Sequence, residues 1–253
     1  MKKFRNPLLF ALAVLPVAVI GGYFAAVYSI SSMESSLLED AIRQLGSREA
    51  VILASTVQPV MLALLCAFFG YILSQKLGLM VPFRFQKAPL LRVVVISLLC
   101  GGILSLDAWT FARWIPALID YYSPAGSFDA ATWLASILYG GVIEEVMMRL
   151  FVMSLLAFLG WRLFFRQRES VPTGVLIGAN ILSTLAFAAG HLPATAATLG
   201  ALTPLLLLRC FLLNGAFGLL FGRFYRKYGI QYAMLSHALL HIVSRTVWLI
   251  ALP

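Results

Sequence analysis

The feature that most constrains this chain is a series of long apolar runs that carry almost no charge. Several of them reach the length of about 20 residues that a helix needs to cross the hydrocarbon core of a bilayer. Hydrophobic residues make up 61% of the sequence and charged residues only 11%, whereas a soluble domain has about 25% charged residues. The outer surface must therefore face lipid, and we expect an all-α, polytopic bundle of transmembrane helices.

The apolar runs predict about seven spans, and six to eight fit the same pattern. We place them at 8–30, 51–74, 93–111, 130–160, 173–191, 204–222 and 229–250. The first run follows a basic start like that of a signal peptide but is too long for one, so we expect an uncleaved helix. The fourth is too long for one straight crossing, so it is expected to tilt or to project one end into the interface. No linker separates two units, so residues 1–253 are expected to form a single integral membrane domain.

The connections between the spans alternate in charge. Lysine and arginine cluster in four places: Lys2, Lys3 and Arg5; Lys76, Arg84, Lys87 and Arg92; Arg162, Arg166 and Arg168; Arg223, Arg226 and Lys227. Seven spans put these clusters on one side, and the other side holds Glu34, Glu39, Asp40, Glu49, Asp107, Asp120 and Asp129. The positive-inside rule then predicts a cytoplasmic N-terminus and an external C-terminus. The short loops and inner basic clusters suit a bacterial inner membrane.

Two further features of the connections bear on function. The net charge of +9 does not indicate nucleic-acid binding, because no basic stripe interleaved with aromatic residues is present. The polar segment 31–49 places Leu37, Leu38, Ile42 and Leu45 on one face, which predicts a short amphipathic helix at the membrane surface. The run 192–205 contains Pro193, Gly200 and Pro204 and is read as a re-entrant or interfacial loop.

Charges inside the apolar runs are the strongest functional signal. A charged side chain at bilayer depth costs at least about 2.5 kcal/mol and is functional by default. Glu144, Glu145 and Arg149 lie in the fourth span, and Arg245 lies in the seventh. Glu145 and Arg149 are four residues apart, so they can meet on one helix face. Glu144 points about 100° away, lacks a local partner, and suits a general base.

All three histidines of the chain share this part of the sequence. His191 closes the fifth span, and His237 and His241 lie four residues apart on one face of the seventh. If the bundle is compact, three helices direct two glutamates and three histidines at one point. We therefore expect a shared functional site. We expect Asn180 and Asn214 to contribute to contacts between helices.

This set of residues favours hydrolysis of an amide bond within the membrane. Glu144, aided by His191, would take a proton from water, and His237 and His241 would stabilise the oxyanion. A metal version is the alternative: His191, His237 and His241 are candidate ligands for Zn²⁺, with Glu144 as the base for metal-bound water. The ordinary H-E-x-x-H motif is absent, and no cofactor is certain from the residues.

The same residues resemble a known family. Residues 144–149 are similar to the EExxxR motif of the CPBP family, the CaaX-protease, bacteriocin-processing and Abi-like membrane proteins; Phe187 to His191 resembles its FxxxH motif. His237 to His241 is similar to its third motif, in which His241 stands where Asn is frequent. The resemblance covers about 130–245, which would be the catalytic core.

The resemblance implies an intramembrane endopeptidase. Glu144 and His191 would activate water, His237 and His241 would line the oxyanion site, Arg149 would hold Glu145, and Phe187 would support the site. We expect a membrane protein or peptide as substrate, within the lipid bilayer. Two other readings stay open: a non-catalytic scaffold or bacteriocin-immunity protein that acts with a partner enzyme, and a transporter or proton channel.

Overall fold

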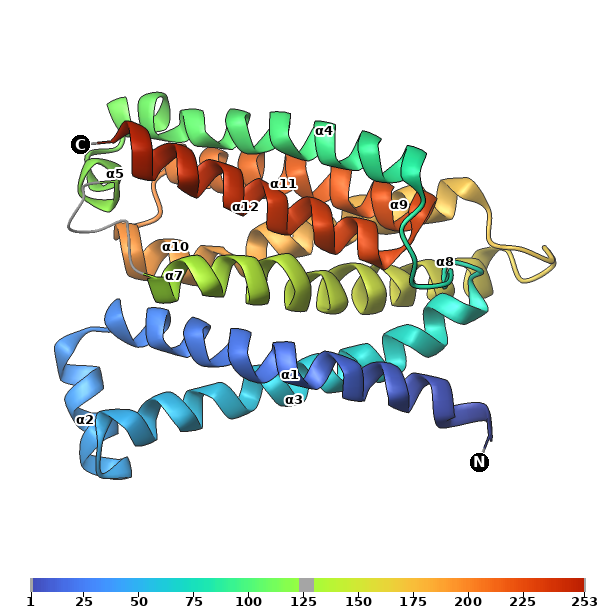
Figure 1. Ribbon diagram of the computed structural model, residues 1–253, viewed down its shortest axis with the longest axis horizontal. Helices are drawn as coiled ribbons and strands as arrows, with labels where there is room; N and C mark the ends of the chain where they lie inside the picture. Colours follow the sequence, from blue (N-terminus) through green and yellow to red (C-terminus); the bar gives the residue numbers. More distant parts are fainter. Residues whose placement is uncertain (1, 123–129, 253) are drawn as a thin grey trace.

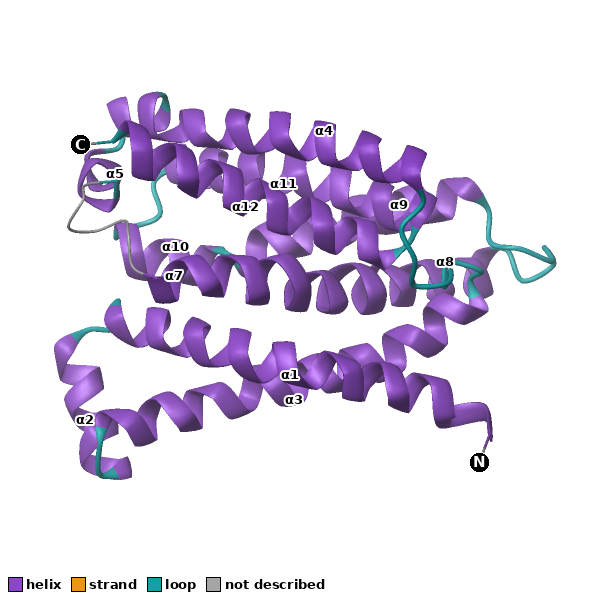
Figure 2. Ribbon diagram, viewed as in Figure 1, coloured by secondary structure: helices purple, strands orange, loops and turns teal. Residues whose placement is uncertain are grey.

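Every regular element in the part of the chain that the structure describes, residues 2–122 and 130–252 of a computed structural model, is a helix (Figures 1 and 2). The elements are α1 (Lys2–Ser31), α2 (Ser35–Leu45), α3 (Arg48–Lys76), α4 (Lys87–Ser105), η1 (Leu106–Trp109), η2 (Phe111–Arg113), α5 (Pro116–Tyr121), α7 (Ala130–Leu134), η3 (Ala135–Glu144), η4 (Val146–Met153), α8 (Ser154–Phe164), α9 (Thr173–Gly190), α10 (Leu192–Leu199), α11 (Pro204–Tyr228) and α12 (Ile230–Ala251). The predicted all-α fold is confirmed.

About seven segments are able to cross a membrane. In the described residues, six helical segments have the necessary length and apolarity: Phe4–Ser31, Arg48–Lys76, Lys87–Arg113, Thr173–Leu199, Pro204–Tyr228 and Ile230–Ala251. The seventh is a composite helix in which α7, η3, η4 and α8 follow one another without a break. Its middle, η3 and η4, is π-helical, a wider winding that occurs most often near functional sites. This composite helix corresponds to the span predicted at 130–160.

The composite helix is the centre of the bundle. α1 and α3 pack against each other and against one side of it, α12 packs along another side, and α4 lies outside α12. α9 and α11 pack together and complete the ring (Figure 1). Small residues permit these close approaches: a side chain on Gly101 would meet Val243 of α12, and one on Gly141 would meet Ala238. Such contacts between small residues are typical of helices in membranes.

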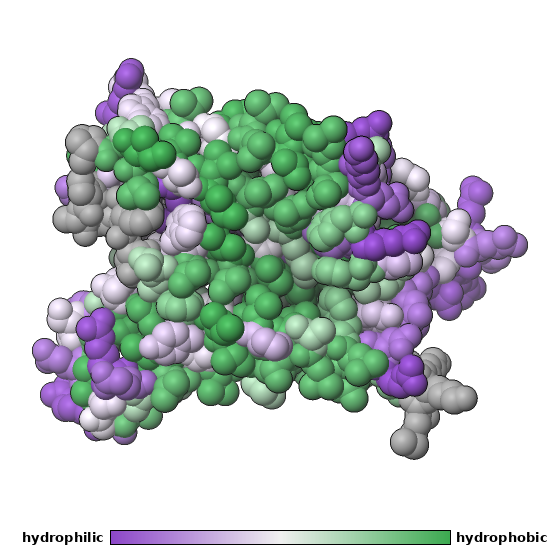
Figure 3. All heavy atoms as spheres, viewed as in Figure 1, coloured by the Kyte–Doolittle hydropathy of each residue, from purple (hydrophilic) through white to green (hydrophobic). Residues whose placement is uncertain are grey.

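The outer surface is apolar around the middle of the molecule. Figure 3 shows a broad hydrophobic belt with hydrophilic residues gathered at the two ends. Leu53 of α3, Leu99 of α4, Ile181 of α9 and Leu208 of α11 are exposed large apolar side chains. Because no other described part of the protein covers these side chains, we infer that lipid surrounds them and keeps them from water. The amphipathic α2 fits this arrangement: it buries no residue, and the prediction of a helix in 31–49 is confirmed.

One end of the bundle gathers the connections that carry the basic clusters. The α3–α4 connection meets the start of α12, where the Gln231 amide donates to the carbonyl oxygens of Pro82 and Arg84. Gly229, with φ of 107°, allows the tight turn from α11 to α12 beside this connection. Figure 1 places the N-terminus and the α8–α9 connection at the same end.

Two local predictions need correction. The segment after His191 is not a loop for most of its length, because residues 192–199 form α10, which begins with Pro193 in its first turn. Asp107 is not an exposed loop residue: it is buried in η1 and paired with Arg209. Asp129, predicted in a loop, lies outside the described residues.

Candidate active site

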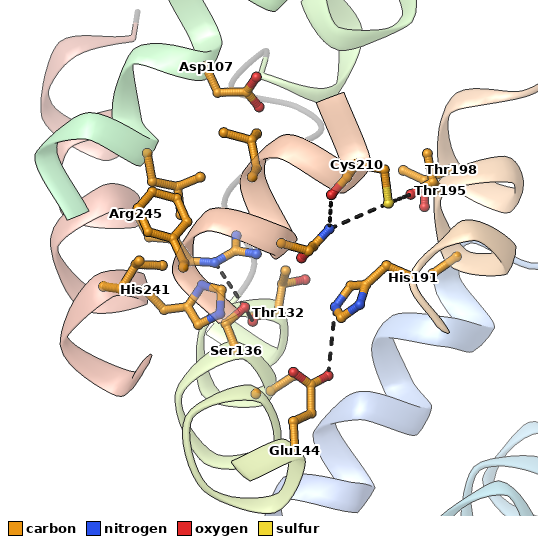
Figure 4. Close-up of a pocket in the computed structure, with 18 of the residues that line it drawn as sticks. Asp107, Thr132, Ser136, Glu144, His191, Thr195, Thr198, Cys210, His241 and Arg245 are labelled. Atoms are coloured by element: carbon orange, nitrogen blue, oxygen red, sulfur yellow. Dashed lines mark hydrogen bonds and ion pairs between the residues drawn. The ribbon is translucent and has the colours of Figure 1, made fainter. Parts of the chain in front are cut away.

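A cavity of about 400 Å³ lies between the composite helix and helices α9 to α12. Glu144, His191, His237 and His241 line its inner part, and Tyr121, Tyr122 and Thr198 line the part toward α5 and α10. Figure 4 shows Glu144, His191 and Arg245 arranged around one space. The cavity therefore extends from one end of the bundle to the polar residues in the middle of the helices. This end is opposite the one that carries the basic connections.

Glu144 and His191 face each other across this cavity. The Nε2 atom of His191 lies 4.0 Å from Oε1 of Glu144, and the two side chains are 32% and 20% exposed. The His191 Nδ1 atom is 2.8 Å from the Phe187 carbonyl oxygen, which can only accept, so Nδ1 carries a proton. In the neutral imidazole, Nε2 is then an acceptor that faces the carboxylate. Two acceptors cannot form a hydrogen bond with each other, but at this distance one water can donate to both.

Glu145, the next residue, has a different environment. Its side chain is fully buried, with Oε1 3.2 Å from an Arg149 terminal nitrogen and 2.9 Å from Nδ1 of His237. The predicted contact between Glu145 and Arg149 is therefore present, and His237 joins it from α12. Arg149 also donates to the Gly218 carbonyl oxygen of α11. The carboxylate and its arginine together tie η4, α11 and α12 to one another.

Two phenyl rings enclose this buried cluster. Phe187 lies edge-on to the His191 ring at 4.5 Å between centroids, and the Arg149 guanidinium lies 4.6 Å from the Phe187 ring centre. Phe221 of α11 stacks on His237 at 4.4 Å and 19°. Phe187 was predicted as a supporting residue from its motif. Phe221 was not found from the sequence, because only the packing of α11 against α12 brings it to His237.

His237 and His241 form a pair on α12. Their Nε2 atoms lie 3.1 Å apart, and the carboxylate on Nδ1 of His237 requires the proton of the neutral ring to be there, so His241 donates to His237. Gly140 leaves room beside them: a methyl group at that position would lie 3.3 Å from His241 Nε2 and 3.8 Å from Glu144 Oε2. The histidine pair and Glu144 therefore border the same small space.

The arrangement of the candidate ligands does not support the alternative of a Zn²⁺ site. Among residues 2–122 and 130–252, no three His, Cys, Asp or Glu side chains lie together as a metal site requires. His237 and His241 are hydrogen-bonded to each other, whereas His191 is directed at Glu144.

A second buried charge cluster lies near the other part of the cavity. The Arg209 Nε atom of α11 is 3.0 Å from both oxygens of Asp107, and the Tyr122 hydroxyl also donates to this carboxylate. Burial, and next the charge of Asp107, raise the pKa of Tyr122, so its phenol keeps the donated proton. The ring of Tyr122 packs against Trp248 of α12, tilted by 55° at 4.8 Å between centroids. The cluster fixes α5 to α11 and α12.

Three polar residues of α9 and α11 had an uncertain or missed role. Arg209 was not recognised from the sequence because it lies close to the start of α11. Asn214 was predicted to join helices, but its amide donates within α11 to the Cys210 carbonyl and its side chain lines the cavity. Asn180 does join helices, since it donates to the Leu219 carbonyl of α11 at 3.0 Å.

Comparison with known protein families finds one match in the part of the chain that carries these residues. The model of the Rce1-like family, type II CAAX prenyl endopeptidase Rce1-like, matches residues 126–243. This range includes Glu144, His191, His237 and His241. The segment belongs to the CPBP family. No curated protein and no solved structure matches the chain.

The CPBP assignment gives the general activity of the chain. The Rce1-like family is a family of endopeptidases, so the protein is classed as a hydrolase, and its apolar helices make it an integral membrane protein. The matched segment begins close to the composite helix and ends within α12. It therefore contains the elements that carry the glutamates and histidines of the cavity.

Proposed function

We propose that this protein is an intramembrane endopeptidase that hydrolyses a peptide bond by water activated between Glu144 and His191. The 4.0 Å separation of His191 Nε2 and Glu144 Oε1 carries the proposal. A water that donates to both acceptors directs its oxygen lone pairs away from them, toward a bound carbonyl carbon. Glu144 takes the proton as the bond forms and delivers it to the leaving amine.

The second part of the site receives the carbonyl oxygen. Glu145 holds His237 through Nδ1, so that Nε2 of His237 faces His241. A proton lies between the two imidazoles and can be directed at the oxyanion, which forms next to Gly140. Fixed donors at the position of developing charge are worth about 3–4 kcal/mol of barrier each. Arg149 and the rings of Phe187 and Phe221 keep this arrangement rigid.

The clustering of these residues favours an enzyme over a proton channel or transporter. A relay places titratable groups in a row along a path, whereas here Glu144, His191 and the histidine pair surround one space. The buried contacts that hold the site residues also favour catalysis over a scaffold. A scaffold does not require a carboxylate that faces a histidine across a cavity. We infer that the segment 130–245 is the catalytic core of a single domain.

Orientation and substrate follow from the two ends of the bundle. We place the basic end in the cytoplasm of a bacterium with the protein in the inner membrane, as the positive-inside rule directs. The cavity then reaches its site from the outer half of the bilayer, which suits a membrane protein or peptide substrate. Labelling with an impermeant maleimide tests this: Ser36→Cys should react in intact cells, and Ser170→Cys only after lysis. The reverse pattern contradicts the orientation.

The activity is tested by comparing protein termini in membranes that contain the wild-type protein, Glu144→Gln or Glu39→Gln. Glu39 is exposed on α2 and serves as the matched control. New termini should be present with the wild type and the control and absent with Glu144→Gln. If all three sets are identical while His191→Ala has a phenotype, the proteolytic function is refuted and a scaffold takes its place.

A further inference from the structure

A cluster of three cations lies at the basic end of the bundle, outside the cavity. Arg92 is in the second turn of α4, Arg223 and Lys227 lie four residues apart near the end of α11, and all three are exposed. Among the described residues, none of the three forms a salt bridge. Glu169, in the α8–α9 connection, is the described acidic residue at this end. The described protein therefore leaves these charges without a counter-ion, and an anion beside them would reduce their mutual repulsion.

Tyr228 brings the cations of the two helices to one place. Its hydroxyl interacts with the side chains of Arg92 and Lys227, and the Lys227 Nζ atom lies 5.4 Å from the centre of its ring. Below this point Val93 of α4 and Phe224 of α11 belong to one buried apolar cluster, which keeps the two helices side by side. Because arginine and lysine can only donate, the phenol retains its own proton to donate. A guanidinium, an ammonium and a hydroxyl together suit the oxygens of a phosphate.

Aromatic rings beside the cluster indicate its depth in the membrane. Tyr228 lies 5.5 Å from Tyr232 of α12, and Tyr232 lies 5.3 Å from Phe85 of the α3–α4 connection, measured between ring centroids. Phe85 is 48% exposed. Tyrosine is enriched where the hydrocarbon core meets water, because its ring is apolar and its hydroxyl is polar. The cations therefore lie at the level of lipid headgroups.

Both helices continue from the cations into exposed apolar faces. On α4, Leu99 follows Arg92 by two helical turns on the same face and is 64% exposed. On α11, Leu219 precedes Arg223 by one turn and is 41% exposed. Cations at the end of the bundle and apolar side chains toward its middle correspond to the two parts of a phospholipid, its headgroup and its acyl chains.

We propose that α4 and α11 form a binding site for an anionic phospholipid, whose phosphate is held by Arg92, Lys227 and Tyr228. Basic pockets between transmembrane helices bind headgroups in this way. Both helices also pack against α12, so a lipid that bridges them stabilises the packing of all three. The site does not depend on the proposed hydrolysis, because none of its residues lines the cavity.

The test measures the Tm of purified full-length protein in a neutral detergent, with phosphatidylglycerol or phosphatidylcholine of the same acyl chains. Phosphatidylglycerol should raise Tm more than phosphatidylcholine does, and the difference should decrease at high salt. The double variant Arg92→Gln with Lys227→Gln should need at least about tenfold more phosphatidylglycerol for the same shift. The control is Arg166→Gln with Arg168→Gln, exposed in the α8–α9 connection, which should respond like the wild type.

A second measurement keeps the inference testable if the double variant is unstable. Arg92→Lys preserves the charge and should retain most of the response, and native mass spectrometry should find one phosphatidylglycerol on the wild type and none on Arg92→Gln. Equal shifts with the two lipids, or an equal loss in the double variant and the control, would overturn the site and leave only a general attraction to the basic surface. A full shift with glycerol 3-phosphate alone would also overturn it and assign the cations to a soluble anion.

Discussion

The described part of the bundle contains two buried clusters in which an arginine meets a carboxylate, and they differ in how the chain brings them together. Glu145 and Arg149 lie on one helix, both fully buried, with His237 as the third partner. Asp107 and Arg209 come from η1 and α11, and Tyr122 is their third partner. The Arg209 side chain is 16% exposed and lines the cavity. The first cluster therefore orients a histidine of the site, whereas the second fastens α5 to the bundle.

The largest expected effect comes from breaking the first cluster. Arg149→Met leaves the Glu145 carboxylate buried without its cation, which should lower the free energy of unfolding by about 3–5 kcal/mol. Unfolding in mixed micelles with increasing denaturing detergent measures this. The double variant Arg149→Met with Glu145→Met should recover much of the loss, because no charge remains buried. A double variant no more stable than the single one contradicts the pairing.

The same change in the second cluster should cost less. Arg209→Met leaves Asp107 next to the cavity, where Tyr122 still donates to it and water can enter. We expect a loss of about 1–3 kcal/mol, measured in the same unfolding experiment. The cleavage rate of the folded fraction should change little. A loss as large as that of Arg149→Met would show that the two clusters are equivalent.

Gly140 tests the claim that the histidine pair and Glu144 border one small space. Gly140→Ala puts a methyl group 3.3 Å from His241 Nε2 and 3.8 Å from Glu144 Oε2. Cleavage should fall about tenfold, which corresponds to 1.4 kcal/mol, with little change in stability. Gly178→Ala is the control, because nothing lies within 4 Å of the added methyl group. Equal activity of the two variants argues against a substrate at Gly140.

The smallest effect is expected from Tyr122→Phe. This change removes one hydrogen bond to Asp107 and keeps the packing of the ring on Trp248, so the free energy of unfolding should fall by about 1 kcal/mol. Because the raised pKa of Tyr122 keeps its phenol protonated, the difference from the wild type should be constant from pH 6 to pH 9. A difference that disappears as the pH rises would mean that the phenol ionises in this range.

The two clusters also show which features of the molecule could be predicted from the sequence and which could not. Apolar runs predicted the all-α fold and about seven spans, because length and hydrophobicity are local properties. The Glu145–Arg149 contact followed from a spacing of four within one helix. The Asp107–Arg209 pair joins residues 102 apart, and Asp107 was expected in a loop. Nothing in the spacing says which helices become neighbours.

The candidate site shows the same division. The meeting of Glu144 with the histidines was expected, since all lie at similar depth in three helices. Their individual partners depend on packing: Phe221 stacks on His237, and Ser136 holds Arg245. The π-helical winding of η3 and η4 was not predicted either, because the apolar run indicated only the length of the span.

The most direct test compares Glu144→Gln and Glu145→Gln, since these neighbours carry the same side chain in different roles. Cleavage of a membrane substrate and thermal unfolding are measured on the same preparations. Glu144→Gln should unfold within a few degrees of the wild type and show no cleavage. Glu145→Gln should unfold at a clearly lower temperature, because Arg149 and His237 lose their carboxylate. Cleavage at the wild-type rate by folded Glu144→Gln would contradict the account.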